Sequence, residues 1–310
     1  NPFVTFPDEE ARQIVTDLHQ VDGDSTLPLM NISQPNIVIL LLESWSADLV
    51  ESLGGEPGIT PNFKELEKEG LLFTDFYASG NRSQQAMGSL FAGLPGLPIT
   101  TITDHPEKYA ELPSFIKDIK QAGYYTSFWF GGQLNYGNIL SYLMSNEFDE
   151  ITQGKDLPSS FVRGKLGVHD EYLLNYVATE LNNIPQPFFT TVFTLSSHSP
   201  YDQPMEDEIH WPKAEKDFVN SAHYTDKALG EFFRLASQQP WYSNTLFLMV
   251  ADHSHRSYRN HPLGSFEHHK IPLLITGPAL ESEFRGKTFD KPSGNTDIPA
   301  TLLAQLNLDH

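Results

Sequence analysis

Residues 245–256 have the sequence Thr245-Leu-Phe-Leu-Met-Val-Ala-Asp252-His253-Ser-His255-Arg256. The run from Thr245 to Val250 is apolar and partly β-branched, and it has the length of one buried strand. Side chains just past the carboxyl end of a parallel strand face the crevice in which α/β sheets bind ligands. An aspartate oxygen and an imidazole nitrogen there can bind one divalent metal ion, although the same pair also serves as a cap or a turn. The stretch therefore predicts a buried strand that ends at a candidate metal site.

Two further apolar runs end in polar side chains. Asn36–Leu42 is followed directly by Glu43, and Phe188–Leu195 leads through two serines to His198. Because the carboxyl ends of parallel strands meet at one edge of a sheet, we expect these side chains to lie near the acid and the imidazole described above. For Glu43 a cap of the following turn is an equally good interpretation, and a single histidine is usually structural.

Strands and helices alternate along the whole chain. Other short strands are predicted at residues 71–76, 124–130 and 271–276, and helices at residues 60–70, 83–93, 113–121, 169–181, 217–237 and 296–303. This alternation predicts an α/β fold with a mainly parallel central sheet and helices on both faces. Residues 1–34 show no clear period apart from a short helix near Glu9–Leu18, so we expect them to lead into one domain over residues 35–310.

A polar turn at residues 80–82 precedes a helix that is rich in small residues and ends at Gly93 and Pro95. Ser83 falls in the first turn of this helix, where backbone N–H groups and the helix dipole favour an anion. Arg82 beside it supplies a planar cation that suits phosphate or sulfate. The simpler interpretation of Ser83 is an ordinary helix cap.

The composition excludes several classes of function. The chain of 310 residues has 40 acidic and 20 basic side chains, a formal charge of −20, so it is expected to repel nucleic acid. It has no cysteine, which excludes disulfides, thiolate metal sites and a cysteine nucleophile. The sequence contains no apolar run long enough to cross a bilayer. Since it starts at Asn1 without an initiator methionine, we expect it to be part of a longer protein whose membrane segment, if present, lies outside it.

Glu43, Ser83, Asp252 and His253 together offer oxygen ligands and one imidazole, a set that suits Mn²⁺, Mg²⁺ or Zn²⁺. The order of motifs resembles the alkaline phosphatase/sulfatase superfamily and, within it, the lipoteichoic acid synthase-like phosphoglycerol transferases. The resemblance runs from Asn36 to the end of the chain and rests on these motifs: Asn36-Ile-Val-Ile-Leu-Leu-Leu-Glu-Ser44, Thr60-Pro-Asn-Phe63, Gly80-Asn-Arg-Ser83, Ser197-His-Ser-Pro200, Ala251-Asp-His-Ser-His-Arg256 and Ile271-Pro-Leu-Leu-Ile-Thr-Gly-Pro278.

The resemblance implies that Glu43, Asp252 and His253 bind one divalent ion, with Mn²⁺ expected ahead of Zn²⁺ and Mg²⁺. It also implies that Ser83 is both a metal ligand and the nucleophile, a position that is usually threonine in the synthase-like branch. Serine keeps the hydroxyl on which the chemistry depends.

The resemblance further implies a set of substrate contacts. His198 matches the substrate-binding histidine, and Arg82 lies beside the nucleophile. The aromatic and arginine contacts to a phosphoglycerol head group fall near Tyr136 and Asn138, where Asn138 lacks the charge. His255 is a candidate for substrate binding or for a second cation site, with a structural role as the simpler interpretation.

The function implied is a metal-dependent transferase. It would move a phosphoglycerol-type group from a lipid donor, through a covalent Ser83 intermediate, to a glycan or lipid acceptor on the extracytoplasmic face of a bacterial membrane. A phosphodiesterase or sulfatase-type hydrolase of the same superfamily is the alternative, although residues 83–87 lack the proline and arginine of a formylglycine sulfatase motif. A catalytically silent binding domain is a third possibility, and its expected sign, a lost ligand, is not seen in these four residues.

Overall fold

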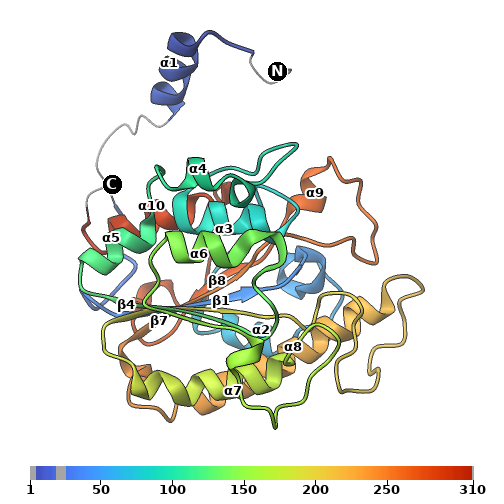
Figure 1. The fold of residues 1–310 in the computed structure, drawn as a ribbon. Helices are drawn as coiled ribbons and strands as arrows, with labels where there is room; N and C mark the ends of the chain where they lie inside the picture. Colours follow the sequence, from blue (N-terminus) through green and yellow to red (C-terminus); the bar gives the residue numbers. More distant parts are fainter. Residues whose placement is uncertain (1–4, 19–25, 309–310) are drawn as a thin grey trace.

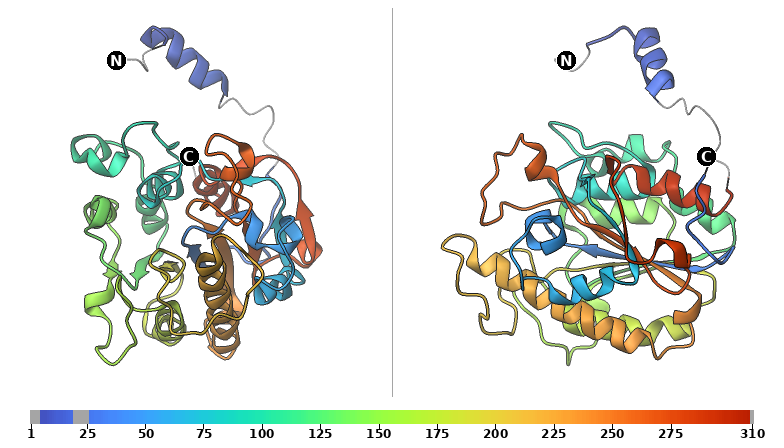
Figure 2. Two further views of the ribbon diagram at one scale, coloured as in Figure 1. Left: turned by 90° about the vertical axis from the view of Figure 1, so that its right-hand side faces the viewer. Right: turned by 180° about the vertical axis from the view of Figure 1, so that it is seen from behind.

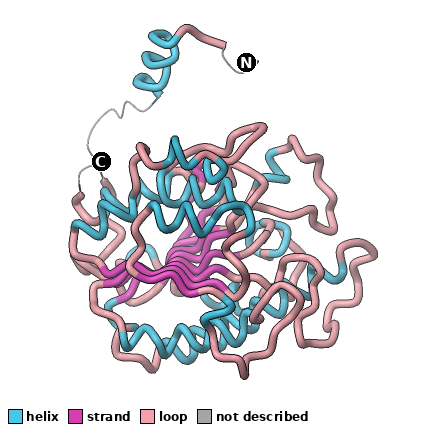
Figure 3. The backbone as a smooth tube through the Cα atoms, viewed as in Figure 1, coloured by secondary structure: helices cyan, strands magenta, loops and turns pink. Residues whose placement is uncertain are grey.

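The protein is described by a computed structural model that covers residues 5–18 and 26–308. Its centre is an eight-stranded sheet in the order β5-β4-β6-β1-β7-β8-β2-β9, and a second, two-stranded sheet pairs β10 with β3 (Figures 1 and 3). The strands are β1 (Asn36–Leu42), β2 (Gly70–Phe73), β3 (Phe76–Tyr77), β4 (Tyr125–Phe130), β5 (Glu150–Thr152), β6 (Phe188–Phe193), β7 (Thr245–Ala251), β8 (Leu273–Thr276), β9 (Lys287–Phe289) and β10 (Ser293–Gly294).

The predicted α/β architecture is confirmed, because strands β5, β4, β6, β1 and β7 are all paired in parallel. β1 lies between β6 and β7, and every residue of β1 and β7 is buried. Burial of each large aliphatic side chain contributes about 1.5–3 kcal/mol to the stability of the fold. Because helices cover both faces of the sheet, these strands have no solvent-exposed polar face. β8 runs antiparallel to both β7 and β2, so the sheet is mainly rather than wholly parallel.

Helices cover both faces of the sheet, as predicted. α3 (Ser83–Ala92), α4 (Pro106–Tyr109), α5 (Phe115–Gln121), α6 (Ile139–Ser145) and α10 (Asp297–Gln305) lie on one face, and α2 (Pro61–Glu67), α7 (Asp170–Glu180) and α8 (Lys216–Ala236) lie on the other (Figure 1). The short α9 (Phe266–His269) lies in the loop that follows β7. Figure 2 shows the same layers from the side and from behind.

Some local expectations need correction. The strand predicted over residues 71–76 is divided into β2 and β3, which pair with different sheets. β5, which is not among the predicted strands, is followed by a 3₁₀ turn at Gly154–Asp156. β5 is only three residues long, so pairing with β4 and not its own pattern makes it a strand.

The start of α2 is stabilised by a residue that is distant in the sequence. Thr60 precedes the helix and Pro61 begins it, but the Thr60 hydroxyl donates to the Leu49 carbonyl and makes no cap. Instead, the buried Asp226 carboxylate on α8 accepts hydrogen bonds from the backbone N–H groups of Asn62 and Phe63, at 2.9 and 2.8 Å. A cap from a distant helix cannot be read from local sequence.

The described residues before β1 comprise one helix and a short segment that packs on the core. α1 (Asp8–Leu18) stands apart from the layered body in Figure 1. Leu29 is buried in the core, and Met30 forms a bridge with Leu280, so the chain is already packed on the domain before β1 begins. Among the described residues, no helix has the length and apolar character that crossing a membrane requires.

Candidate active site

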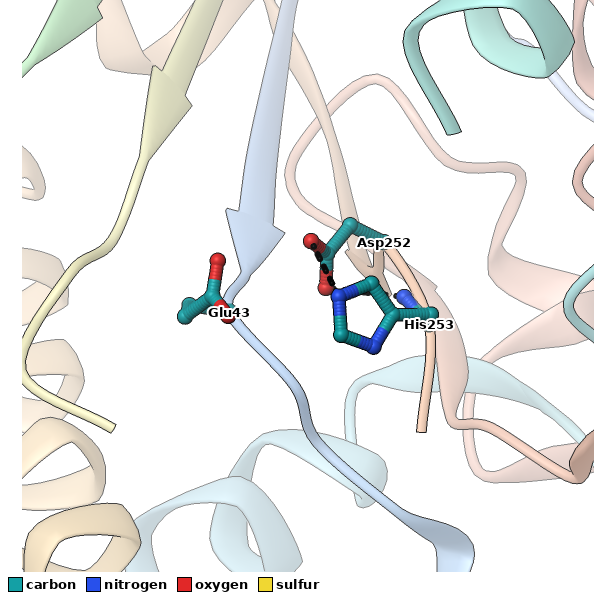
Figure 4. A group of neighbouring side chains, drawn as sticks. All are labelled: Glu43, Asp252 and His253. Carbon is teal, nitrogen blue, oxygen red and sulfur yellow. Dashed lines mark hydrogen bonds and ion pairs between the residues drawn. The ribbon is translucent and has the colours of Figure 1, made fainter. Parts of the chain in front are cut away.

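The parallel pairing of β1 with β7 brings the two candidate carboxylates together. Leu42 pairs with Ala251, so the next residues, Glu43 and Asp252, emerge side by side at the carboxyl edge of the sheet. One ligand atom from each of Glu43, Asp252 and His253 lies within 4.8 Å of the others. Figure 4 shows Glu43 at the end of one strand and the Asp252–His253 pair at the end of its neighbour.

Asp252 and His253, two of the candidate ligands, each have one polar atom held by the backbone and a second that faces the cluster. The Asp252 Oδ1 atom accepts backbone N–H groups from Ser44 and His253, both at 2.8 Å, whereas the buried Oδ2 atom has no hydrogen-bond partner. The His253 Nδ1 atom lies 2.8 Å from the Ser254 carbonyl oxygen, which assigns the ring proton to Nδ1 and leaves Nε2 as an electron-pair donor. The free Oδ2 and Nε2 atoms are 3.3 Å apart.

Ser83 completes the group. It is the first residue of α3, and its Oγ atom lies 3.4 Å from Glu43 Oε2 and 3.5 Å from His253 Nε2. We call Glu43, Ser83, Asp252 and His253 the ligand cluster. Arg82 holds the N-cap position in extended backbone without a side-chain cap hydrogen bond, so Ser83 is the first helical residue and not the cap, and the helix ends at Gly93 in the left-handed conformation.

Burial and charge explain what this cluster needs. Burial of the Glu43 carboxyl raises its pKa well above the ordinary value, and the neighbouring Asp252 carboxylate raises it further. Two buried carboxylates without a cation repel each other, and an unpaired buried oxygen is costly. The separations of 3.3, 3.4 and 3.5 Å agree with the ligand–ligand distance of about 3.4 Å expected for tetrahedral bonds of about 2.1 Å. The donor set therefore fits one divalent ion.

The ligand cluster opens into a cavity of about 440 Å³. The cavity is lined by Glu43, Ser44, Asn81, Arg82, Ser83, Gln84, Tyr136, Ser197, His198, Ser199, Tyr201, His253 and His255. Four of the predicted substrate contacts, Arg82, Tyr136, His198 and His255, belong to this wall. Its volume lies in the range of small-molecule binding sites.

Asn138 is placed differently. Its side-chain amide donates to Asp104 Oδ1 at 2.9 Å, and it is not part of the cavity wall. The neighbouring Gly137 has a φ of +61°, and a Cβ atom there would lie 2.1 Å from the Gln84 side chain. Asn138 itself also has a left-handed φ of +56°, so the backbone turns sharply between Tyr136, which lines the cavity, and Asn138, which does not.

His255 and Tyr201 form one side of the cavity. The Tyr201 hydroxyl lies 3.3 Å from His255 Nε2, while His255 Nδ1 is 2.8 Å from the Arg256 carbonyl oxygen. Burial lowers the pKa of His255, and burial together with nearby acidic groups raises the pKa of Tyr201 to about 12. Both imidazole nitrogens of His255 already lie within hydrogen-bonding distance of a protein oxygen, so neither is available to a second cation. The geometry instead favours a role for His255 in holding the Tyr201 hydroxyl in place.

Several supporting residues were not predicted. The Thr194 hydroxyl accepts the Glu43 N–H at 2.9 Å, and the Ser197 hydroxyl donates to the Glu43 carbonyl at 2.6 Å. The Asn295 side-chain amide donates to the Asp252 carbonyl at 3.3 Å. These residues lie 43 to 154 positions from their partners, so no local spacing signals them.

Comparison with known proteins decides the family, because a model of the sulfatase family matches residues 35–308. The chain belongs to the sulfatase family. A solved structure described as a protein in the alkaline phosphatase superfamily from Vibrio parahaemolyticus is 32% identical, has a TM-score of 0.85, and aligns over 99% of this chain and 76% of that one. This agreement confirms the superfamily that the sequence motifs resemble.

The lipoteichoic acid synthase-like members of the family are similar over most of the chain. The protein YvgJ of Bacillus subtilis, described as lipoteichoic acid synthase-like, is 21% identical over 88% of this chain and 48% of its own length. The lipoteichoic acid synthase LtaP from Listeria monocytogenes, a solved structure, has a TM-score of 0.81 at 21% identity and aligns over 96% of this sulfatase-family chain and 78% of its own. The chain spans about half the length of the curated relatives it matches.

Proposed function

We propose that this sulfatase-family domain is a metal-dependent transferase that moves a phospho-alcohol group, of the phosphoglycerol type, from a lipid donor to a glycan or lipid acceptor. The observation that carries this proposal is the position of the Ser83 Oγ atom, which lies 3.4 Å from Glu43 Oε2 and 3.5 Å from His253 Nε2 in a residue that lines the cavity. Its similarity to lipoteichoic acid synthase-like proteins favours a phospholipid donor.

The ligand cluster would hold one divalent ion, for which we propose Mn²⁺ ahead of Zn²⁺ and Mg²⁺. When bound, such an ion lowers the pKa of a coordinated hydroxyl and neutralises charge that develops on the transferring group. The protein orients the candidate ligands. Backbone groups hold the Asp252 Oδ1 and His253 Nδ1 atoms, which leaves Asp252 Oδ2 and His253 Nε2 available to the ion. These two atoms are 3.3 Å apart, and the Ser83 Oγ atom lies 3.5 Å from Nε2.

In the first step, the Ser83 hydroxyl gives up its proton to solvent, and Oγ attacks the phosphorus of the donor. The Oγ–P bond forms as the bond from phosphorus to the oxygen of the lipid alcohol breaks, and that oxygen takes up a proton. Arg82 and His198, which both line the cavity, would bind the equatorial phosphoryl oxygens. Tyr136, at the rim and 77% exposed, would contact the alcohol portion of the head group.

In the second step, an acceptor hydroxyl attacks the phosphoester on Ser83, the Oγ–P bond breaks, and Ser83 regains a proton. If water takes the place of the acceptor, the same residues perform hydrolysis, so a phosphodiesterase differs only in the molecule that resolves the intermediate. For a lipid-derived donor we propose that the domain works on the extracytoplasmic face of a bacterial membrane, attached through a segment outside this sequence.

The experiment is intact-mass spectrometry of metal-loaded protein incubated with a phosphatidylglycerol-type donor in the absence of acceptor. We expect an added mass of one glycerol phosphate in the wild type and none in Ser83→Ala. An adduct that persists in Ser83→Ala would refute the assignment of Ser83 as the nucleophile. A second incubation with a glycerol-containing acceptor separates the two reactions, because a transferase yields an extended acceptor and a hydrolase yields only free glycerol phosphate.

A further inference from the structure

Ser44 occupies an unusual place directly after β1, between the carboxylate of Glu43 and the turn that leaves the sheet. It is 3% exposed, and its backbone has a φ of +61°. Residues other than glycine rarely adopt this left-handed conformation, and those that do are concentrated at functional sites. The contacts of Ser44 explain why the conformation is kept.

The side chain of Ser44 holds one ligand. Its Oγ atom donates to Glu43 Oε1 at 2.6 Å, a normal distance for an O–H···O hydrogen bond. The other oxygen of the same carboxylate, Oε2, is then the one that lies 3.4 Å from Ser83. The hydroxyl therefore divides the Glu43 carboxylate into a held oxygen and a free oxygen.

The backbone of Ser44 holds a second ligand in the same way. Its N–H group donates to Asp252 Oδ1 at 2.8 Å, and the His253 N–H group donates to the same atom. Asp252 Oδ2 remains without a partner and lies 3.3 Å from His253 Nε2. One residue thus directs a carboxylate from each of two neighbouring strands.

We infer that Ser44 is a positioning residue that sets the orientation of both carboxylates in the ligand cluster and thereby strengthens divalent-metal binding. This inference deepens the proposed function and rests on it for the presence of the ion. The left-handed turn is required because it lets the hydroxyl and the N–H group of a single residue reach two different strands. Outer-shell partners of this kind raise metal affinity by about 10- to 100-fold.

Ser46, in the same turn, provides a matched control. It is also a serine, it is 2% exposed, and its Oγ atom accepts the Asp48 N–H at 3.2 Å as a local helix cap. Among the described residues, Ser46 makes no hydrogen bond to a member of the ligand cluster. The variant Ser46→Ala therefore removes a buried serine hydroxyl from the same turn without removing a hydrogen bond to Glu43 or Asp252. It measures how far a general disturbance of the turn affects metal binding.

The test is isothermal titration of Mn²⁺, and separately of Zn²⁺, into the chelator-treated full chain. Ser44→Ala removes the hydroxyl and keeps the N–H group, and Ser44→Gly removes the hydroxyl and also relieves the backbone strain. We expect both variants to bind each ion about 10- to 100-fold more weakly than wild type, and Ser46→Ala to bind as wild type does. In urea unfolding of the metal-free proteins, Ser44→Gly should have a larger free energy of unfolding than Ser44→Ala, because glycine tolerates positive φ.

The two Ser44 variants separate positioning from folding. If the loss followed only from a weakened fold, Ser44→Gly would regain wild-type affinity, and that result would overturn the inference. Wild-type affinity in both variants would overturn it as well, while leaving the proposed function intact. Weakened binding in both variants, together with a protein that forms no Ser83 adduct, would support the role of Ser44 and reject the transferase. If Ser44→Ala does not fold, Ser44→Gly still decides the question.

Discussion

The ligand cluster and the rim of the cavity are built in different ways. Glu43 and Asp252 follow directly from two adjacent buried strands and are themselves buried, with exposed fractions of 2% and 1%. Arg82, Tyr136 and His198 come from loops and helix ends, and Tyr136 is 77% exposed. Side chains on strand ends are held by the sheet, whereas side chains on loops can change without loss of the core. The cluster is therefore suited to a fixed chemistry and the rim to a variable substrate.

The sharpest way to break this comparison is to change Asp252. In Asp252→Asn the two N–H donors would still hold the amide oxygen at the Oδ1 position, and the NH₂ group would then point at the ion site. We expect metal binding to be lost and kcat to fall by at least about 10³-fold, since metal catalysis contributes several kcal/mol. Elemental analysis after dialysis checks the metal content. Stoichiometric metal in this variant would show that Asp252 is not a ligand.

The rim should respond less strongly. Removal of a charged donor to phosphate costs about 1.5–3 kcal/mol, so Arg82→Ala is expected to lower kcat/KM by about 10- to 100-fold with metal affinity unchanged. Asn138→Ala is the matched control, because its amide is bound to Asp104 outside the cavity, and we expect it to retain nearly wild-type kcat/KM. An equal loss of kcat/KM in Arg82→Ala and Asn138→Ala would contradict the proposal that the substrate binds in the cavity.

The smallest expected effect is on stability in the absence of metal. Because the pKa of Glu43 is raised in the folded state, the folded protein keeps its proton while the unfolded chain loses it. The free energy of unfolding that comes from the protonated Glu43 carboxyl is fully present below the ordinary pKa of glutamate. It is lost as the pH rises through the raised pKa of the folded state. A tenfold difference in proton affinity between the folded and unfolded states corresponds to about 1.4 kcal/mol, so urea unfolding of chelated protein should show stability decreasing over this range.

Two comparisons check that assignment. Glu43→Gln should remove this part of the pH dependence from the metal-free protein, because the amide does not titrate. Addition of Mn²⁺ to the wild type should stabilise it most at the higher pH, where the carboxylate is ionised. A pH dependence that is the same in Glu43→Gln and wild type would assign the effect to another group.

Much of the candidate site could be predicted because it follows from strand ends. Apolar runs of six or seven residues that stop at Glu43 and Asp252 indicate buried strands and, through the geometry of parallel sheets, a shared edge. The helix start at residue 83 was predictable, but only the family resemblance distinguished Ser83 from an ordinary helix cap. Asn138 shows that a motif position alone does not place a side chain, because Gly137 and Asn138 both have left-handed backbone and the Asn138 amide donates to Asp104.

The sequence by itself determined the α/β class, the main strands and helices, and the residue types that can bind a cation and a phosphoryl group. Periodicity and chain punctuation are local properties, and they act over a few residues. Only the tertiary structure decided that Leu42 pairs with Ala251, that Asp226 caps a helix 164 positions away, and that Ser44 contacts both carboxylates. These features depend on strand order and register, which arise from burial of the whole sheet and have no signature in any one segment.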